Sequence, residues 1–310
     1  MHGLLLVDKP EGISSNEVVQ IVKKRVRPAR VGHSGTLDVP ASGLMVLLIG
    51  AGTRALNFLD EIRKTYHMTI VLGEETDTGD REGKIIKKHD ASDITLEAID
   101  EVLGRFRGVV DQVPPHFSAL KRGGVPLHKL ARKGVFPELA PRKVKIFSLE
   151  RKGWVSPHLE LEMVCSKGTY ARAVARDIGQ ALCVGGRIER LRRTKSGPFS
   201  VDNAISLAEI EHLDRGTIEK RLVSLSQALA HIPNFRAQSF EVNKLMRGTA
   251  IHIDRNRVIN AFVDSNSWPR FLKIASTKGD LIVIVSLEPR SDGFYLQPVR
   301  VFNTWENTGS

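Results

Sequence analysis

The sequence has few cysteines and no long hydrophobic run. Its two cysteines, Cys165 and Cys183, lie in neither a CxxC motif nor a histidine-rich cluster, so no disulfide framework or zinc site is indicated. No uninterrupted apolar run approaches the roughly 18 residues of a membrane-spanning helix. We therefore expect a soluble, cytoplasmic protein that does not enter a membrane and holds no metal.

Acidic residues are also scarce relative to basic ones. The chain of 310 residues has 46 lysines and arginines against 35 aspartates and glutamates, a formal charge of +11. This balance favours a polyanionic partner, although a merely basic cytosolic protein would share it. The length allows one large domain and one small domain, each with its own core.

What the chain does contain is a glycine-rich loop, GHSGTLDVPASG, at residues 32–43. Three glycines and Pro40 exclude a regular helix or a central strand there. The apolar run LMVLLI at residues 44–49 follows at once and predicts a buried strand. Asp38 could be held near the floor of a cleft, as a nucleophile or base. The spacing alone favours the alternative, an Asx-turn in which Asp38 caps its own backbone.

A basic segment at residues 112–137 contains no acidic residue. Its prolines and glycines predict mostly irregular backbone, with one helical turn at HKLARK. Such a segment can close over a phosphate backbone and become ordered by it. An ordinary solvated loop would show the same composition. The basic side chains are Lys121, Arg122, Lys129, Arg132 and Lys133.

The remaining patterns predict alternating helices and strands. Ser14 and Glu17 form a capping box before an apolar helix face, and Tyr66 opens a strand at residues 66–72. TDTGDREG at residues 76–83 lacks the ligand spacing of a calcium loop and predicts a hairpin connection. Arg172 falls on the first turn of a helix, and Leu191 lies within a basic cluster at residues 187–195. Beyond a boundary near residues 231–234, strands are expected at 258–263, 271–275, 281–287 and 295–302.

Taken together and in order, these motifs resemble the TruB-type tRNA pseudouridine-55 synthases. The matching stretches are VDKPEGISS (7–15), GHSGTLDVPASGLM (32–45), KTY (64–66), LGEETDTGDREG (72–83), PPHFSALKRGGVPLHKLARKG (114–134), CSKGTYAR (165–172) and LRRTKSGPF (191–199). A lone GTLD would carry little weight, whereas the ordered set covers much of residues 1–200. The resemblance therefore favours a catalytic Asp38 over the Asx-turn.

The resemblance implies an α+β fold in two parts. Residues 1–232 would form the catalytic domain, built on a largely antiparallel mixed sheet with a basic insertion at about residues 114–141. Residues 233–310 look like the small β-rich, PUA-type RNA-binding domain that some family members carry.

The resemblance also implies cofactor-free isomerisation of uridine 55 in the T-loop of tRNA, with the target base flipped into the pocket. Asp38 would be the nucleophile. Tyr66 would stack on the base and help to remove the C5 proton, and Arg172 would pair with Asp38. His33 would contact the RNA, Tyr170 and Leu191 would line the uracil pocket, and Lys121, Lys129, Arg132 and Lys133 would bind phosphates.

The sequence departs from the family at three positions. Val39 follows the aspartate where proline is usual, and Phe117 and His128 stand where tyrosines are common. We expect a monomer that binds the tRNA T-arm with no obligate protein partner. Two rivals remain at this point: a guide-dependent synthase within an RNA–protein particle, and a non-catalytic RNA-binding protein.

Overall fold

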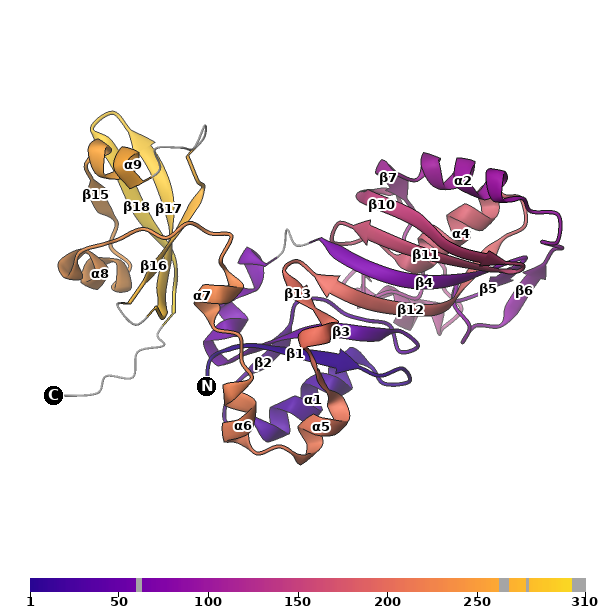
Figure 1. Ribbon diagram of the computed structural model, residues 1–310, viewed down its shortest axis with the longest axis horizontal. Helices are drawn as coiled ribbons and strands as arrows, with labels where there is room; N and C mark the ends of the chain where they lie inside the picture. The colour runs from indigo at the N-terminus through magenta and orange to yellow at the C-terminus, as the bar shows by residue number, and fades with distance from the viewer. Residues whose placement is uncertain (60–62, 262–267, 277–278, 303–310) are drawn as a thin grey trace.

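The computed structural model describes residues 1–59, 63–261, 268–276 and 279–302 (Figure 1). A ten-stranded sheet runs in the order β14-β1-β3-β12-β4-β11-β10-β7, with β2 beside β3 and β13 beside β12. In this sheet β1 pairs with β14 and β3 with β12 in parallel, and the other pairs are antiparallel, which confirms the expected mixed, largely antiparallel sheet. The strands are β1 (Gly3–Lys9), β2 (Val31–His33), β3 (Ser42–Ile49), β4 (Lys64–Leu72), β7 (Gly108–Gln112), β10 (Arg142–Val155), β11 (His158–Cys165), β12 (Gly186–Ser196), β13 (Phe199–Ser200) and β14 (Ile205–Ser206).

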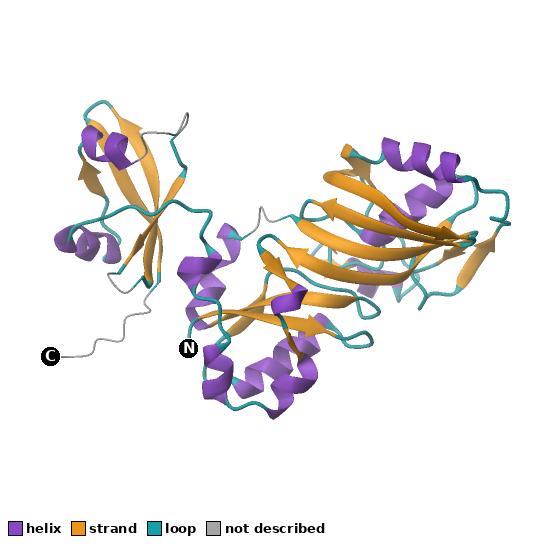
Figure 2. Ribbon diagram, in the orientation of Figure 1, coloured by secondary structure: helices purple, strands orange, loops and turns teal. Residues whose placement is uncertain are grey.

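Helices pack on the large sheet in two groups (Figures 1 and 2). Helices α2 (Leu96–Arg105) and α4 (Ala171–Ala181) pack against β10 and β12, while α1 (Ser15–Arg25), α5 (Leu207–His212) and α6 (Arg215–Lys220) lie near β1. The predicted capping box begins α1: the Ser14 hydroxyl accepts from the Glu17 amide, and the Glu17 carboxylate accepts from the Ser14 amide. This cap fixes where the chain turns from β1 into the helix.

Strands β1 and β3 are buried on both faces. Leu5 and Val7 of β1 pack in one apolar cluster with α1, α2 and α4, whereas Leu4 and Leu6 pack in a second cluster on the opposite face. Because successive side chains of a strand point to opposite faces, such strands read as continuous apolar runs. The run at residues 44–49 is therefore a strand whose two faces both lie in the core.

The basic cluster at residues 187–195, for which no element was expected, is the central strand β12. It pairs with β4 along most of its length, and Ile188, Leu191 and Arg193 are buried. Bulges between Ile188 and Arg190 and between Arg193 and Lys195 shift its register, so the alternation of buried and exposed residues is broken. The expected hairpin after β4 is present as β5 (Glu74–Thr76) and β6 (Ile85–Lys88).

The C-terminal part forms a separate four-stranded sheet in the order β15-β18-β17-β16 (Figure 1). Its elements are α8 (Ser239–Met246), β15 (Ile251–Ile253), α9 (Arg255–Ala261), β16 (Phe271–Ala275), β17 (Leu281–Arg290) and β18 (Gly293–Val301). The strand predicted at residues 258–263 is wrong: residues 258–261 belong to α9, and the last two lie outside the described residues. The β-branched pair Val258–Ile259 suggested a strand, but only Val258 of the pair is buried, as on one face of a helix.

One apolar cluster joins the two parts of the chain, although the C-terminal sheet also has a cluster of its own that includes Ile253, Leu272 and Val283. The cluster on the outer face of β1 and β3 also contains Leu281, Ile284 and Phe302 from the C-terminal sheet. The Lys273 ammonium donates to the carbonyls of Ser226 and Leu229 at the end of α7 (Leu225–Ala228), so β16 is also tied to that helix. The domain boundary near residue 232 stays a prediction. Within the described residues, no helix is long and apolar enough to cross a membrane.

The shared core predicts that both parts unfold together. Phe302 is 2% exposed, so Phe302→Ala should lower the free energy of unfolding by about 3–5 kcal/mol, as expected for a truncated buried aromatic side chain. Urea unfolding followed by circular dichroism should show one transition at a lower midpoint. Val155→Ala, at a side chain 77% exposed, should change the stability by less than about 0.5 kcal/mol. Two separate transitions in the unaltered chain would contradict the shared core.

Candidate active site

Asp38 lies in the loop between β2 and β3, and this loop is fastened to the end of β1 and the start of α1. The Ser15 hydroxyl donates to the Leu37 carbonyl and accepts from the Leu37 amide, both at 2.8 Å. The buried Lys9 ammonium donates to the carbonyls of Pro10, Ile13 and Val39. Burial lowers the pKa of Lys9 to about 8, so the ammonium is mostly charged at neutral pH. The loop is thus held on both sides of Asp38.

One position of the loop accepts only glycine, for a steric reason. Gly43 has φ +102°, and an added Cβ would lie 2.3 Å from the carbonyl oxygen of Arg193 on β12. No other residue fits there, because the L side chain would clash with backbone. The Arg193 guanidinium is buried and donates to the carbonyls of Gly35, Thr36 and Leu44. Strand β12 therefore shapes the loop at both of its ends.

Arg172 is the side chain on which the site converges. It is the second residue of α4 and only 6% exposed. Its Nε donates to Asp38 Oδ2 at 2.9 Å, Nη1 to the Thr78 carbonyl at 2.9 Å and Nη2 to the Phe117 carbonyl at 2.8 Å. Four segments far apart in the sequence thus meet at one guanidinium. The Asp38 carboxylate bonds this arginine and remains 40% exposed, open to a solvent-borne partner.

Asp80 is a site residue that the sequence analysis missed. Its Oδ2 lies 3.6 Å from Arg172 Nη1, and its Oδ1 accepts from the Thr78 hydroxyl and the Glu82 amide. The carboxylate is buried, so Arg172 balances two carboxylates, one buried and one exposed. The turn-rich pattern of residues 76–83 predicted only a hairpin connection. The signal that could have singled out Asp80 was an acidic residue inside one of the stretches that carry the resemblance.

Tyr66 and Leu191 lie on neighbouring strands beside the loop. Both are buried, and Tyr66 of β4 pairs in register with Arg193 of β12. Burial raises the pKa of Tyr66, and the charge of Asp38 raises it further, while Arg193 acts in the opposite direction. The phenol therefore keeps its proton at neutral pH. It offers a ring for stacking, and it becomes a base only if its pKa falls when substrate binds.

Tyr170 and His33 flank the same region. Tyr170 is the N-cap of α4, and its backbone amide and carbonyl both bond the Gln112 side chain. Burial raises the pKa of Tyr170, and the Asp38 charge adds to the rise. Burial, with the nearby charges of Arg193 and Lys64, lowers the pKa of His33, so its imidazole is neutral. The His33 ring accepts from the Gly35 amide through Nδ1.

The space beside Asp38 is small. A cavity of about 10 Å³ is lined by residues that include Asp38, Arg172 and Leu191, and also by Asp80. This volume accommodates about one water molecule. A ring as large as a nucleobase would fit this hollow only if the lining side chains moved apart.

The insertion contacts the site through a backbone carbonyl, whereas its charged side chains are exposed to solvent. It contains β8 (Lys121–Arg122), β9 (Val125–Pro126) and α3 (Leu127–Ala131), so the expected helical turn is present. The Phe117 carbonyl accepts from Arg172, and the His128 amide donates to the Ser118 carbonyl. Lys121, Lys129, Arg132 and Lys133 are exposed, and no carboxylate of the described residues lies within ion-pair distance of them. These four residues are not brought to Asp38.

Comparison with known proteins identifies the family. Residues 23–171 match the family described as "TruB family pseudouridylate synthase (N terminal domain)", and residues 172–230 match "tRNA pseudouridylate synthase B C-terminal domain". The chain is 40% identical over 254 residues to "tRNA pseudouridine synthase B" of Chromohalobacter salexigens, covering 82% of this chain and 83% of that protein. It is 38% identical over 287 residues to the protein of the same name from Aquifex aeolicus, covering 91% and 98%.

The chain belongs to the TruB family of pseudouridylate synthases, which are isomerases. Its fold is also that of the protein in "Crystal Structure of a Cbf5-Nop10-Gar1 Complex", with a TM-score of 0.70 over 97% of this chain and 84% of that one, at 23% identity. The suspected family and the pseudouridine synthase fold are thus confirmed. Residues 233–310 lie beyond both family matches, so their PUA-like character stays a prediction.

The convergence on Arg172 predicts that its planar fork matters more than its charge. Arg172→Lys keeps one charge but cannot reach Asp38, Thr78 and Phe117 together. Displacing a reacting group by about 1 Å costs about 100-fold in rate, so turnover should fall by about that factor.

Arg176→Lys is the matched control, because Arg176 lies one turn later on α4 and bonds Asp177 and Val113 instead. Its single-turnover rate should stay near that of the unaltered enzyme. Equal rates for the two lysine variants would show that Arg172 does not position the site.

Proposed function

We propose that this chain isomerises uridine 55 in the T-loop of tRNA to pseudouridine, with Asp38 as the nucleophile and no cofactor. The observation that carries this proposal is the Asp38 carboxylate, 40% exposed yet oriented by a buried arginine at 2.9 Å. A carboxylate held in this way is available to an incoming nucleotide, and the hydrogen bond from the arginine keeps it aimed. The relatives named tRNA pseudouridine synthase B support tRNA as the substrate.

The proposed reaction uses these groups in turn. The Asp38 carboxylate adds to the nucleotide and the N1 glycosidic bond breaks. The detached uracil turns in the pocket, C5 bonds to C1′ of the ribose, and the bond to Asp38 breaks. The C5 proton then passes to water and N1 takes up a proton from water, so the protons balance. Tyr66 holds the turning ring by stacking, and Leu191 and Tyr170 confine it. Because the nucleotide keeps all its atoms except for exchanged protons, no oxidant or group donor is needed.

Binding must supply the free energy that opens the RNA. Extruding a base costs a few kcal/mol, and stacking it on one aromatic ring returns about 1–3 kcal/mol. Stacking on Tyr66 therefore barely offsets flipping. Phosphate contacts from the exposed basic residues of the insertion supply the remainder, and His33 supports the RNA where the base has left its stack.

The enzyme acts alone on the T-arm, as a monomer in the cytoplasm. The long basic insertion and the relatives at about 40% identity both favour a stand-alone enzyme over the guide-dependent rival. The likeness to the complex with Nop10 and Gar1 concerns the fold alone. A non-catalytic RNA-binding protein would not need Asp38, Arg172 and Asp80 to meet, so the convergence also argues against that rival.

Asp38→Asn tests the chemistry. The amide keeps the shape but removes the negative charge, so conversion of uridine 55 should vanish while the tRNA affinity changes little. Pseudouridine is mapped after incubation of unmodified tRNA with the purified protein alone. A tRNA with cytidine at position 55 is the RNA control, and no pseudouridine should form at any of its uridines. Conversion by the asparagine variant would remove Asp38 from the mechanism, and a requirement for an added guide RNA would favour the rival.

A salt titration tests the insertion. Changing Lys129, Arg132 and Lys133 to glutamine removes up to three phosphate contacts, and each contact contributes roughly 0.7 to 0.9 to the slope of log affinity against log salt concentration. The slope for a T-arm hairpin should therefore flatten by about two to three units.

The matched control changes three exposed residues on or after α6, Arg215, Lys220 and Arg221, to glutamine. This variant has the same net charge and should keep the original slope. Equal slopes for both triple variants would make the insertion an ordinary solvated loop.

A further inference from the structure

A groove of about 870 Å³ lies at the junction of the catalytic part and the C-terminal sheet. Its walls come from the end of the 3-10 helix η1 (Gly50–Phe58), the turn between β12 and β13, the segment after α7, and strands β16 and β18. None of these segments contributes to the Asp38 site. The volume lies within the range of about 300–1,000 Å³ that is typical of small-ligand sites.

An aromatic pair spans the groove. Phe58 of η1 and Phe271 of β16 are half-buried, with ring centroids 5.4 Å apart and planes at 88°. The Arg270 guanidinium carbon lies 4.9 Å from the centre of the Phe271 ring. The guanidinium lies over part of one Phe271 face, and because both rings are only half-buried, part of their aromatic surface stays open to the groove.

The rim of the groove is basic. Arg270, Arg300 and His231 are exposed there, and His231 bonds the Phe58 carbonyl through Nε2 at 3.1 Å. Among the described residues that line the groove there is no carboxylate. An apolar, aromatic floor with arginines at the rim is the chemistry that single-stranded nucleic-acid sites use for a base and its phosphate.

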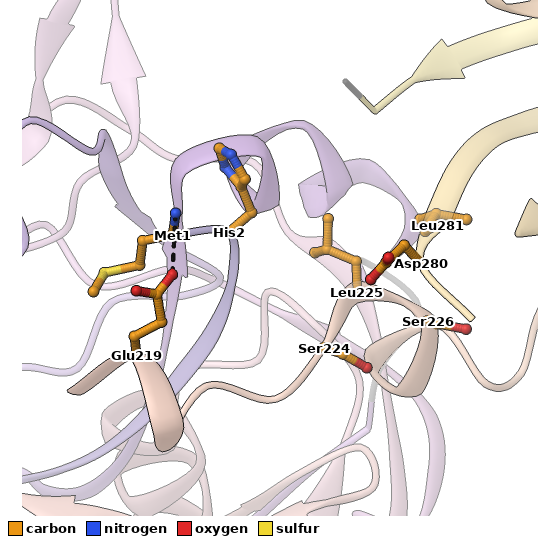
Figure 3. A pocket seen from close by; sticks show the side chains of 8 residues that line it. All are labelled: Met1, His2, Glu219, Ser224, Leu225, Ser226, Asp280 and Leu281. Atoms are coloured by element: carbon orange, nitrogen blue, oxygen red, sulfur yellow. Dashed lines mark ion pairs between the residues drawn. The ribbon is translucent and has the colours of Figure 1, made fainter. Parts of the chain in front are cut away.

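A second hollow at the same junction shows the contrast (Figure 3). It measures about 300 Å³ and is lined by Met1, Glu219 and Asp280, among others, with the Met1 ammonium 3.2 Å from the Glu219 carboxylate. Two carboxylates at its wall repel a phosphate, and among the described residues that line it there is no phenylalanine, tyrosine or tryptophan, the His2 imidazole being its one ring. The nucleotide chemistry is therefore a property of the first groove and not of the junction in general.

The groove is held open by the fold itself. Phe271 packs against the core that β1, β3 and the C-terminal strands share, and Lys273 ties β16 to the end of α7. A site whose walls are already fixed loses little conformational entropy when a ligand enters.

We infer that this groove binds one unpaired nucleotide of the RNA substrate, with the base against Phe58 and Phe271 and the phosphate on Arg270 and Arg300. The choice of RNA as the source rests on the proposed function and on the excess of positive charge over the whole chain. A paired nucleotide does not fit this chemistry, because its two faces are already stacked within the helix. The site is a second RNA contact, separate from the pocket at Asp38.

The test measures the part of the affinity that depends on the base. The probes are a single-stranded tetra-adenylate, the same ribose-phosphate chain without bases, and free AMP. Stacking one base contributes at least about five-fold in affinity, so the tetra-adenylate should bind at least about five times more tightly than the abasic chain. Phe271→Leu keeps an apolar side chain but removes the ring, and should lower this ratio several-fold.

The arginines are tested with matched charge. Arg270→Gln with Arg300→Gln should flatten the salt dependence of tetra-adenylate binding by about one unit, at roughly 0.7 per phosphate of a single strand. The control, Arg236→Gln with Arg247→Gln, removes two exposed arginines of the same domain outside the groove and should leave the slope unchanged.

Three results would overturn the inference. The first is an unchanged affinity ratio of tetra-adenylate to abasic chain in Phe271→Leu, and the second is an equal salt dependence of tetra-adenylate binding in the two arginine double variants. The third is AMP binding as tight as tetra-adenylate binding, which would assign the groove to a free nucleotide. Modification of a T-arm hairpin is measured beside each binding experiment. The unaltered protein should modify the hairpin whatever the groove binds, so failure of the groove and failure of the proposed function are told apart.

Discussion

The ion pair between Arg172 and Asp38 is the contact on which the site depends. One buried guanidinium joins the catalytic loop, the β5–β6 hairpin and the insertion to the start of α4. Removing the partner of a buried charge costs about 3–5 kcal/mol, because the remaining charge is left unpaired. Without Arg172, the carboxylates of Asp38 and Asp80 would lose their ion-pair partner, and the Thr78 and Phe117 carbonyls would lose a hydrogen-bond donor. The same side chain thus orients the carboxylate and holds the walls of the pocket together.

A second constraint keeps this site on a rigid base. Strands β1 and β3 are buried on both faces, with the helices of the catalytic part on one side and the C-terminal sheet on the other. The Asp38 loop leads directly into β3, so the packing of β3 in the core fixes the position of the loop's end. The hollow beside Asp38 and Arg172 is small, with room for about one water molecule, while the Asp38 carboxylate itself remains 40% exposed. We interpret this arrangement as a rigid backbone frame, in which the side chains around the hollow move apart only when a base enters.

Local sequence signals predicted the elements whose causes are local. The Ser14 capping box and the apolar run of β3 specify their own structure, and both are present as expected. Strand β12 was missed because its arginines are paired by partners far away in the chain, such as Asp8 with Arg192 and the Leu44 carbonyl with Arg193. Asp80 and Lys9 were missed because the contacts that tie them to the site, with Arg172 and with the Val39 carbonyl, are distant in the chain. The pairing of Asp38 with Arg172 was expected only from the family resemblance, because 134 residues separate them and no periodicity links them.

The central claim is that Asp38 forms the covalent bond to the nucleotide. The most direct measurement is rapid-quench mass spectrometry of the enzyme during a single turnover of a T-arm hairpin, followed by digestion of the protein and of the RNA. The account predicts a transient peptide that carries one nucleotide on Asp38, which forms before pseudouridine appears and decays as it accumulates. A nucleotide attached to any other residue would contradict the account.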